Sequence, residues 1–215
     1  MQLVGLILIV GLLLAFVQVG ILTIAFEKLG LSTHSAFVLL FSSLFGSAIN
    51  LPLMKVDAER PALESMPEHL REAMAQALRK FQGKTTIAVN VGGCLIPLVF
   101  SYYLIHFNRI VPFKIIIATL IVTAVSRWAS RPVPGVGIGM PIFIAPLTAA
   151  ITALGIDPDQ SAPLAYICGT LGVLIGADLL RLKDVRKMGV PIASIGGAGT
   201  FDGIFITGIV AVLLA

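Results

Sequence analysis

Residues 195–215 read IGGAGTFDGIFITGIVAVLLA, a glycine-rich opening followed by an apolar run that contains one carboxylate, Asp202. Only thirteen residues follow Asp202. As an α-helix they would extend about 20 Å at 1.5 Å per residue, which is less than the roughly 30 Å hydrocarbon core of a bilayer. We therefore expect the glycine-rich segment to carry the chain part of the way into the membrane before this helix begins.

The composition of the whole chain is that of a membrane protein. Hydrophobic residues make up 57% of its 215 residues and charged residues 12%, about half the charged fraction of a soluble domain. A spanning helix needs about 20 apolar residues. We therefore expect an all-α polytopic protein of about seven transmembrane helices, forming a single membrane domain over 1–215. The predicted spans cover about 3–26, 33–54, 86–106, 111–127, 138–155, 161–180 and 190–215.

The basic residues predict the orientation of these spans. Twelve of the fifteen Lys and Arg residues fall in the loops after the second, fourth and sixth spans, and only Lys28, Arg109 and Lys114 fall on the other side. Cytoplasmic loops carry the excess of Lys and Arg. We expect the N-terminus in the cytoplasm and the C-terminus outside.

Between the second and third spans, SMPEHLREAMAQALRKFQG (65–83) has the apolar stripe of an amphipathic helix over about 66–82. Ser65 and Glu68 have the spacing of a capping box, and Gly83 is a natural stop. We expect this helix on the cytoplasmic membrane surface; docking a partner or gating a site is the alternative.

Several function classes have no signature here. Cys94 and Cys168 form no CxxC pair, the three histidines form no HExxH, and no GxxxxGK[ST] is present. We expect no metal and no cofactor. The net charge is +4, and in a membrane protein an excess of basic residues sets the orientation of the spans. We therefore expect the lipid bilayer as a partner, and no nucleic acid.

Two acids lie within apolar runs: Asp178, in GVLIGADLLRL (172–182), and Asp202. A charge at the centre of a spanning helix costs at least ~2.5–3.5 kcal/mol, so both are candidate functional residues. Both are expected in the cytoplasmic third of consecutive spans. Asn50 and Asn90, on the second and third predicted spans, are expected at a depth similar to that of the two acids. The sequence therefore predicts a layer of polar residues.

Two carboxylates close together in a site of low dielectric share a proton, because both cannot ionise easily. One can then take a proton from water while the other polarises a scissile carbonyl. The sequence thus predicts a catalytic pair, Asp178 and Asp202. Gly197 and Gly199, with Asn50 and Asn90, are the predicted substrate-binding residues, since glycines let a substrate backbone approach.

Residues 165–205 resemble the GxGD-type intramembrane aspartyl proteases, the class of presenilin, signal peptide peptidase and the prepilin peptidases. The resemblance implies one catalytic Asp on the sixth span and a second at the start of the seventh, here Asp178 and Asp202, with Gly197 and Gly199 as the motif glycines. It also implies membrane-spanning peptide segments as substrates.

The resemblance has departures. Thr200 and Phe201 separate Gly199 from Asp202, whereas in the family the acid follows the glycine directly. Asp178 follows Ala177 instead of tyrosine, and no Pro-Ala-Leu element follows. As a whole, the chain also resembles an uncharacterised family of prokaryotic multi-pass proteins, which implies an inner or cell membrane location.

Two other functions use the same residues. Prolines and glycines beside polar groups also occur at the broken helices of transporters, so the acids could line a path for a small solute, a cation or a proton. A non-catalytic membrane scaffold is the third hypothesis, in which the acids pair structurally with Arg181 or Arg127.

Overall fold

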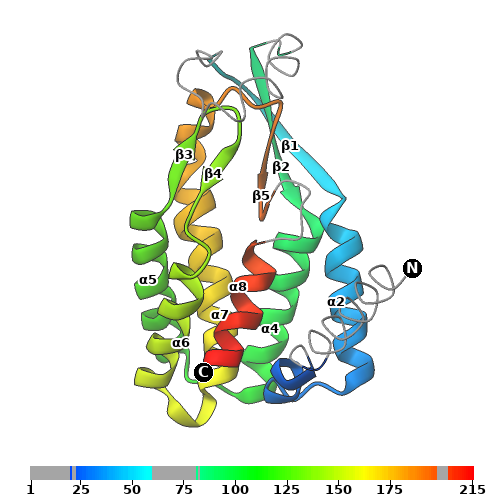
Figure 1. The fold of residues 1–215 in the computed structure, drawn as a ribbon, viewed down its shortest axis with the longest axis vertical. Coiled ribbons are helices and arrows are strands. Elements are labelled where there is room, and N and C mark those ends of the chain that lie inside the picture. The colour runs from blue at the N-terminus through cyan, green and yellow to red at the C-terminus, as the bar shows by residue number, and fades with distance from the viewer. Residues whose placement is uncertain (1–19, 21–22, 60–80, 82, 198–202) are drawn as a thin grey trace, which may run out of the picture.

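The computed structural model describes residues 20, 23–59, 81, 83–197 and 203–215. Most of these residues are helical, and six α-helices are named in chain order in Figure 1. They are α2 (Thr33–Ser47), α4 (Ile96–Asn108), α5 (Pro112–Ala129), α6 (Ile144–Ile156), α7 (Ser161–Val173) and α8 (Gly203–Leu214). Residues 23–28 are helical as well. The helices form one bundle with the C-terminus at one end (Figure 1).

The helical membrane class is confirmed, with fewer clear spans than seven. Three helical stretches within the described residues are long and apolar enough to cross a membrane: Val91–Asn108, Pro112–Ala129 and Pro158–Lys187. Two apolar helices are shorter, α2 and α6. Helix α5 has proline in its first turn, where the missing N–H would have no helical partner anyway. The predicted N-terminus in the cytoplasm and C-terminus outside stay predictions.

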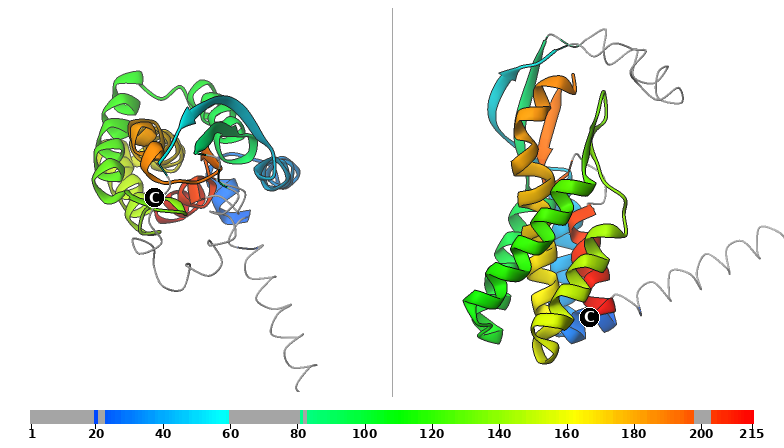
Figure 2. Two further views of the ribbon diagram at one scale, coloured as in Figure 1. Left: turned by 90° about the horizontal axis from the view of Figure 1, so that it is seen from above. Right: turned by 90° about the vertical axis from the view of Figure 1, so that its left-hand side faces the viewer.

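Helix α7 lies at the centre of the bundle. It contacts α4, α5, α6 and α8 (Figure 2), and nearly all its residues are buried. The close approach of α5 depends on glycine just beyond α7: a Cβ at Gly176 would lie 2.4 Å from the carbonyl oxygen of Thr123. Small residues allow such contacts between membrane helices, where lipid offers no hydrophobic drive for association.

The prediction of an all-α fold is wrong at one end of the bundle, where the chain forms a three-stranded sheet. The strands are β1 (Asn50–Asp57), β2 (Lys84–Asn90) and β5 (Ile192–Ile195). They lie in the order β1-β2-β5; β1 and β2 are antiparallel, and β2 and β5 are parallel.

Each strand replaces part of a predicted span. β1 continues from α2, β2 leads toward α4, and β5 precedes α8 (Figure 1), so the predicted spans 33–54, 86–106 and 190–215 each combine a strand with a helix. A short apolar run has the same hydropathy whether it forms a strand or a helix, so hydropathy does not distinguish the two. Pairing between segments far apart in the chain satisfies the strands' backbone groups.

A second, two-stranded sheet joins α5 to α6. Its strands, β3 (Arg131–Val133) and β4 (Gly137–Gly139), are antiparallel. Strand β4 takes up the first two residues of the predicted span 138–155, and α6 begins only at Ile144. Both sheets lie at the end of the molecule opposite the C-terminus (Figure 1). Basic residues of the predicted cytoplasmic loops, Lys84 and Arg131, belong to these strands.

Helical segments of other geometry flank the bundle helices. Two are π-helical turns, η2 (Val91–Leu95) before α4 and η4 (Leu174–Asp178) after α7. Two are 3₁₀-helices, η3 (Pro158–Gln160) before α7 and η5 (Leu179–Lys187) after η4. π-helical turns occur frequently at functional sites.

Two predicted elements fall largely outside the described residues. Of the first span, 3–26, the structure describes residue 20 and residues 23–26. Of the interfacial helix, 66–82, it describes Phe81, which is buried. Their remaining residues stay predictions.

Candidate functional site

A cavity of about 440 Å³ lies where the sheet end of the molecule meets the bundle. Its walls come from β4, η4, η5, β5 and the first turns of α8. Most of the lining side chains are apolar, and the polar ones are those of Asp178, Ser194 and Thr207. An apolar pocket with a few polar groups is the usual form of a small-ligand or active site.

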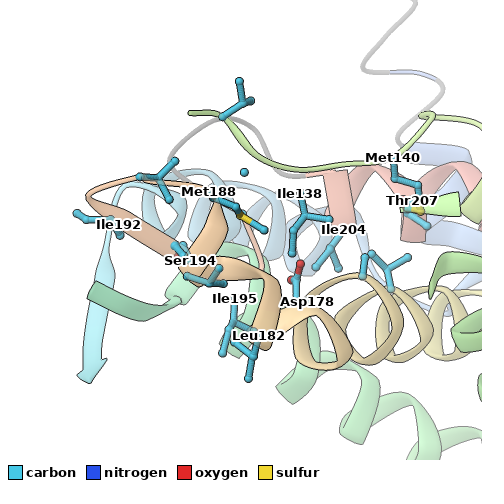
Figure 3. A pocket seen from close by; sticks show the side chains of 18 of the residues that line it. Ile138, Met140, Asp178, Leu182, Met188, Ile192, Ser194, Ile195, Ile204 and Thr207 are labelled. Carbon is cyan, nitrogen blue, oxygen red and sulfur yellow. The ribbon is translucent and has the colours of Figure 1, made fainter. Parts of the chain in front are cut away.

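Asp178 stands at the point where the π-helical turn η4 becomes the 3₁₀-helix η5. Its side chain points into the cavity toward Ile138 and Ile204 (Figure 3). The residue is half-buried. Its Oδ2 accepts a hydrogen bond of 2.7 Å from the backbone N–H of Gly196, a donor from the turn after β5. A carboxylate thus faces an apolar space and has one backbone donor fixed to it.

Glycine is required at position 196. Its φ is +87°, in the left-handed region. A Cβ at this position would lie 2.7 Å from both N and Cβ of Cys94 in η2. The next residue, Gly197, has a φ of +103° and lines the cavity. The predicted motif glycine Gly197 is therefore at the site.

The second predicted acid, Asp202, lies outside the described residues, as does Gly199. Gly197, directly before this segment, and Ile204, the second described residue after it, both line the cavity. Whether Asp178 and Asp202 form a pair therefore stays a prediction.

Asn50 and Asn90 lie side by side across the β1–β2 pair and belong to one hydrogen-bonded network. The Nδ2 of Asn90 donates to Oδ1 of Asn50 at 3.1 Å and to the carbonyl of Ser47 at 2.7 Å. Asn90 Oδ1 accepts from the N–H of Gly93 at 2.8 Å and so caps η2. The Oγ of Ser194 donates to Oδ1 of Asn50 at 2.5 Å. Ser194 lines the cavity, whereas neither asparagine is among its lining residues.

Arg181 has partners other than Asp178. Its Nη1 lies 3.1 Å from Oδ2 of Asp184, and its Nε lies 3.1 Å from Oγ of Ser130. Its Nη2 donates to the carbonyls of Arg127 and Ser130 at the end of α5. Of the structural pairs that the scaffold hypothesis allowed, with Arg181 or Arg127, the one between Asp178 and Arg181 is therefore not formed among the described residues; the scaffold hypothesis itself stays a prediction.

The free edge of β5 also belongs to the site. Within the described residues β5 pairs with β2 alone. The N–H of Thr86 donates to the carbonyl of Pro191, and backbone groups alternate in direction along a strand. Ile192 and Ser194 therefore direct their N–H groups away from β2, and all of β5 lines the cavity.

Three parts of the site were missed from the sequence: the β4 wall, the Gly196 donor and the hydroxyls of Ser194 and Thr207. The glycine-rich stretch PGVGIGM (134–140) was the available signal for β4. For Gly196 the signal was its place beside the motif glycines. No group of three His, Cys, Asp or Glu side chains within the described residues could hold a metal ion.

Comparison with known proteins gives a family for this chain. Residues 44–214 match a family described as a protein of unknown function (DUF1614), and the chain belongs to this family. The match includes every residue of the cavity wall. No curated protein and no solved structure matches the chain.

Proposed function

We propose that this protein is an intramembrane hydrolase that cleaves peptide bonds of membrane segments with Asp178 and Asp202 as its catalytic acids. One observation carries the proposal: the Asp178 carboxylate faces an apolar cavity whose wall includes the edge strand β5. A carboxylate for water activation and a strand edge for an extended backbone are thus side by side.

The proposed chemistry needs two carboxylates with one proton between them. The ionised carboxylate takes a proton from a water molecule, whose oxygen attacks the scissile carbonyl carbon. The protonated carboxyl donates its hydrogen bond, and then its proton, to the carbonyl oxygen. Collapse of the tetrahedral intermediate breaks the C–N bond: the carboxyl that the water had protonated gives its proton to the amine nitrogen, and one hydroxyl of the intermediate returns its proton to the other carboxylate, which restores the starting state.

The cavity suits an extended apolar substrate. A peptide added to the free edge of β5 would use the N–H and C=O groups of Ile192 for main-chain hydrogen bonds. The side chains of Ile138, Leu182 and Ile195 give it apolar neighbours. An extended segment exposes its peptide bonds, whereas a helix keeps each carbonyl hydrogen-bonded, so strand addition also prepares the bond for attack.

The position of Asp202 in the chain supports its role as the second acid. Gly197, directly before its segment, and Ile204, in the first turn of α8 after it, line the same cavity as Asp178. The chain from 197 to 204 therefore starts and finishes at this cavity.

The test uses the full chain in lipid nanodiscs and a probe that mimics the tetrahedral intermediate. The probe is an apolar peptide with a hydroxyethylene group in place of one peptide bond and a photoreactive benzophenone. We expect it to label the wild-type protein, and to label Asp178→Asn and Asp202→Asn weakly or not at all. Asp159→Asn is the matched control, because Asp159 is exposed in η3, outside the cavity wall.

Equal labelling of wild type, Asp178→Asn and Asp202→Asn would exclude the protease hypothesis. The alternative of transport has its own assay, a pH- or cation-dependent flux into proteoliposomes that requires Asp178. The scaffold hypothesis predicts that Asp178→Asn changes neither labelling nor flux.

A further inference from the structure

The hydrogen bond between Gly196 and Asp178 joins two segments that approach the cavity from different directions. Asp178 ends the π-helical turn after α7, and Gly196 directly follows the strand β5. We propose that Gly196 is a positioning residue whose N–H holds Oδ2 of Asp178, so that Oδ1 is presented to the cavity. The role of Asp178 as a reacting group rests on the proposed function; the contact itself does not.

The geometry of the bond makes it a strong orienting contact. Its length is 2.7 Å, in the range of charge-assisted hydrogen bonds. Within the described residues, the Gly196 N–H is the one donor bonded to this carboxylate. The neighbouring guanidinium of Arg181 is bound to Asp184, Ser130 and the end of α5 instead. Among the described residues, one backbone amide and no side-chain cation therefore sets the direction of the Asp178 carboxylate.

The Gly196 amide is held in place from behind by η2. Its α-carbon is so close to Cys94 that a β-carbon would lie 2.7 Å from backbone and side-chain atoms there. The π-helical turn η2 is in turn capped by Asn90, which accepts from the N–H of Gly93. Gly196 therefore fills a fixed gap between η2 on one side and Asp178 on the other.

The strand before Gly196 is also tied to neighbouring elements. Ser194 donates to Asn50, which accepts from Asn90 as well, and β5 pairs with β2 from Ile192 to Ile195. The asparagines thus act on the site through β5 and η2. The direction of the Asp178 carboxylate therefore depends on the position of β5. This is the same strand to which we expect an extended substrate to add.

The sharpest test removes the Gly196 N–H and little else. Glycolate at position 196 turns the Ile195–Gly196 amide into an ester, which keeps the backbone shape and loses the donor. The full chain is labelled with ¹³C-aspartate in nanodiscs, and the infrared bands of Asp178 are isolated by subtracting the spectrum of Asp178→Asn. We expect these bands to shift in the ester variant, because the carboxyl loses a hydrogen bond that it accepts.

Two substitutions complete the test. Gly196→Ala is expected to shift the same bands, since its Cβ displaces the amide from Asp178. Gly83→Ala is the matched control: Gly83 also has a left-handed φ, +73°, but the nearest atom to its Cβ would be the carbonyl oxygen of Ala58 at 3.9 Å. We expect Gly83→Ala to leave the Asp178 bands unchanged even where it lowers stability.

Unchanged Asp178 bands in the ester variant would overturn the positioning role, whatever happens to activity. Shifted bands support it, and probe labelling of the same samples reports separately on the proposed function. Shifted bands in a protein whose wild type is not labelled by the hydroxyethylene probe would leave the positioning contact intact and reject the hydrolase. The two proposals can therefore fail independently.

Discussion

Arg181 and Asp184 form an ion pair of 3.1 Å on one turn of η5, and the same guanidinium reaches across to the end of α5. The arginine side chain is 12% exposed and the aspartate 29%. The guanidinium of Arg181 is therefore bonded to partners other than Asp178. The Asp178 carboxylate, one turn earlier, faces the cavity and accepts a hydrogen bond from the Gly196 N–H. Two acids six residues apart thus have different partners and different surroundings.

Replacing Arg181 with methionine should destabilise the junction between η5 and α5. The change removes the hydrogen bonds to Ser130 and to the carbonyl of Arg127, and hydrogen bonds of charged groups contribute about 1.5–3 kcal/mol each at most. We expect a lower Tm in detergent. The corresponding loss in the free energy of unfolding should be on the order of 1–3 kcal/mol. Arg186→Met is the control, because Arg186 is exposed on the same helix; an equal loss in both variants would contradict the prediction.

Gly176→Ala should weaken the contact between α5 and the segment after α7. Its Cβ would lie 2.4 Å from the Thr123 carbonyl oxygen and 3.0 Å from Cβ of Ser126, so the helices must separate. Overpacking of this kind costs about 1–3 kcal/mol. Thermal unfolding in detergent measures the loss.

Gly155→Ala is the matched control for that substitution. Gly155 lies in α6, and its Cβ would meet no atom within 4 Å. Alanine is favoured over glycine in a helix by roughly 0.5–1 kcal/mol, so this variant should be neutral or slightly more stable. A loss of stability at Gly155 as large as at Gly176 would show that helix packing is not the cause.

Lys114 and Asp157 should contribute little to stability although their ion pair is short. The Nζ–Oδ2 distance is 2.8 Å, and although the aspartate side chain is only 12% exposed, the lysine side chain is 37% exposed and keeps its ammonium in contact with solvent. Exposed pairs typically contribute about 0.2–1 kcal/mol. A double-mutant cycle with Lys114→Met and Asp157→Asn should give a coupling in this range that falls as salt is added. A coupling of several kcal/mol that is independent of salt would contradict this expectation.

Two substitutions of Asn50 should differ in their effect on β5. Asn50→Asp keeps an Oδ1 that can accept from Asn90 and Ser194, whereas Asn50→Leu keeps the size and loses both bonds. Each such bond contributes about 0.5–1.5 kcal/mol. Hydrogen exchange at the amides of Ala193 and Ile195 should therefore be up to about tenfold faster in Asn50→Leu and closer to wild type in Asn50→Asp. Equal exchange rates in the two variants would show that the asparagine bridge does not hold the strand.

The sequence by itself determined the membrane class and the helices that depend on local composition. The predicted span 111–127 is the helix Pro112–Ala129, and 161–180 lies within the helical stretch Pro158–Lys187. Hydropathy is a sum over neighbouring residues, so it identifies an apolar helix without knowledge of the rest of the fold. Asp178 could be found in the same way, because one acid in an apolar run is a local exception.

Only the tertiary structure decided where helices give way to strands and what surrounds Asp178. Asn50 and Asn90 were expected in spans, yet they face each other across β1 and β2, segments joined by pairing between residues distant in the chain. The donor to Asp178 is a backbone amide, which every residue except proline carries, so no residue type marks it in the sequence. Its position follows from the left-handed turn at Gly196 and the packing of that turn on η2, contacts that exist only once the elements have come together.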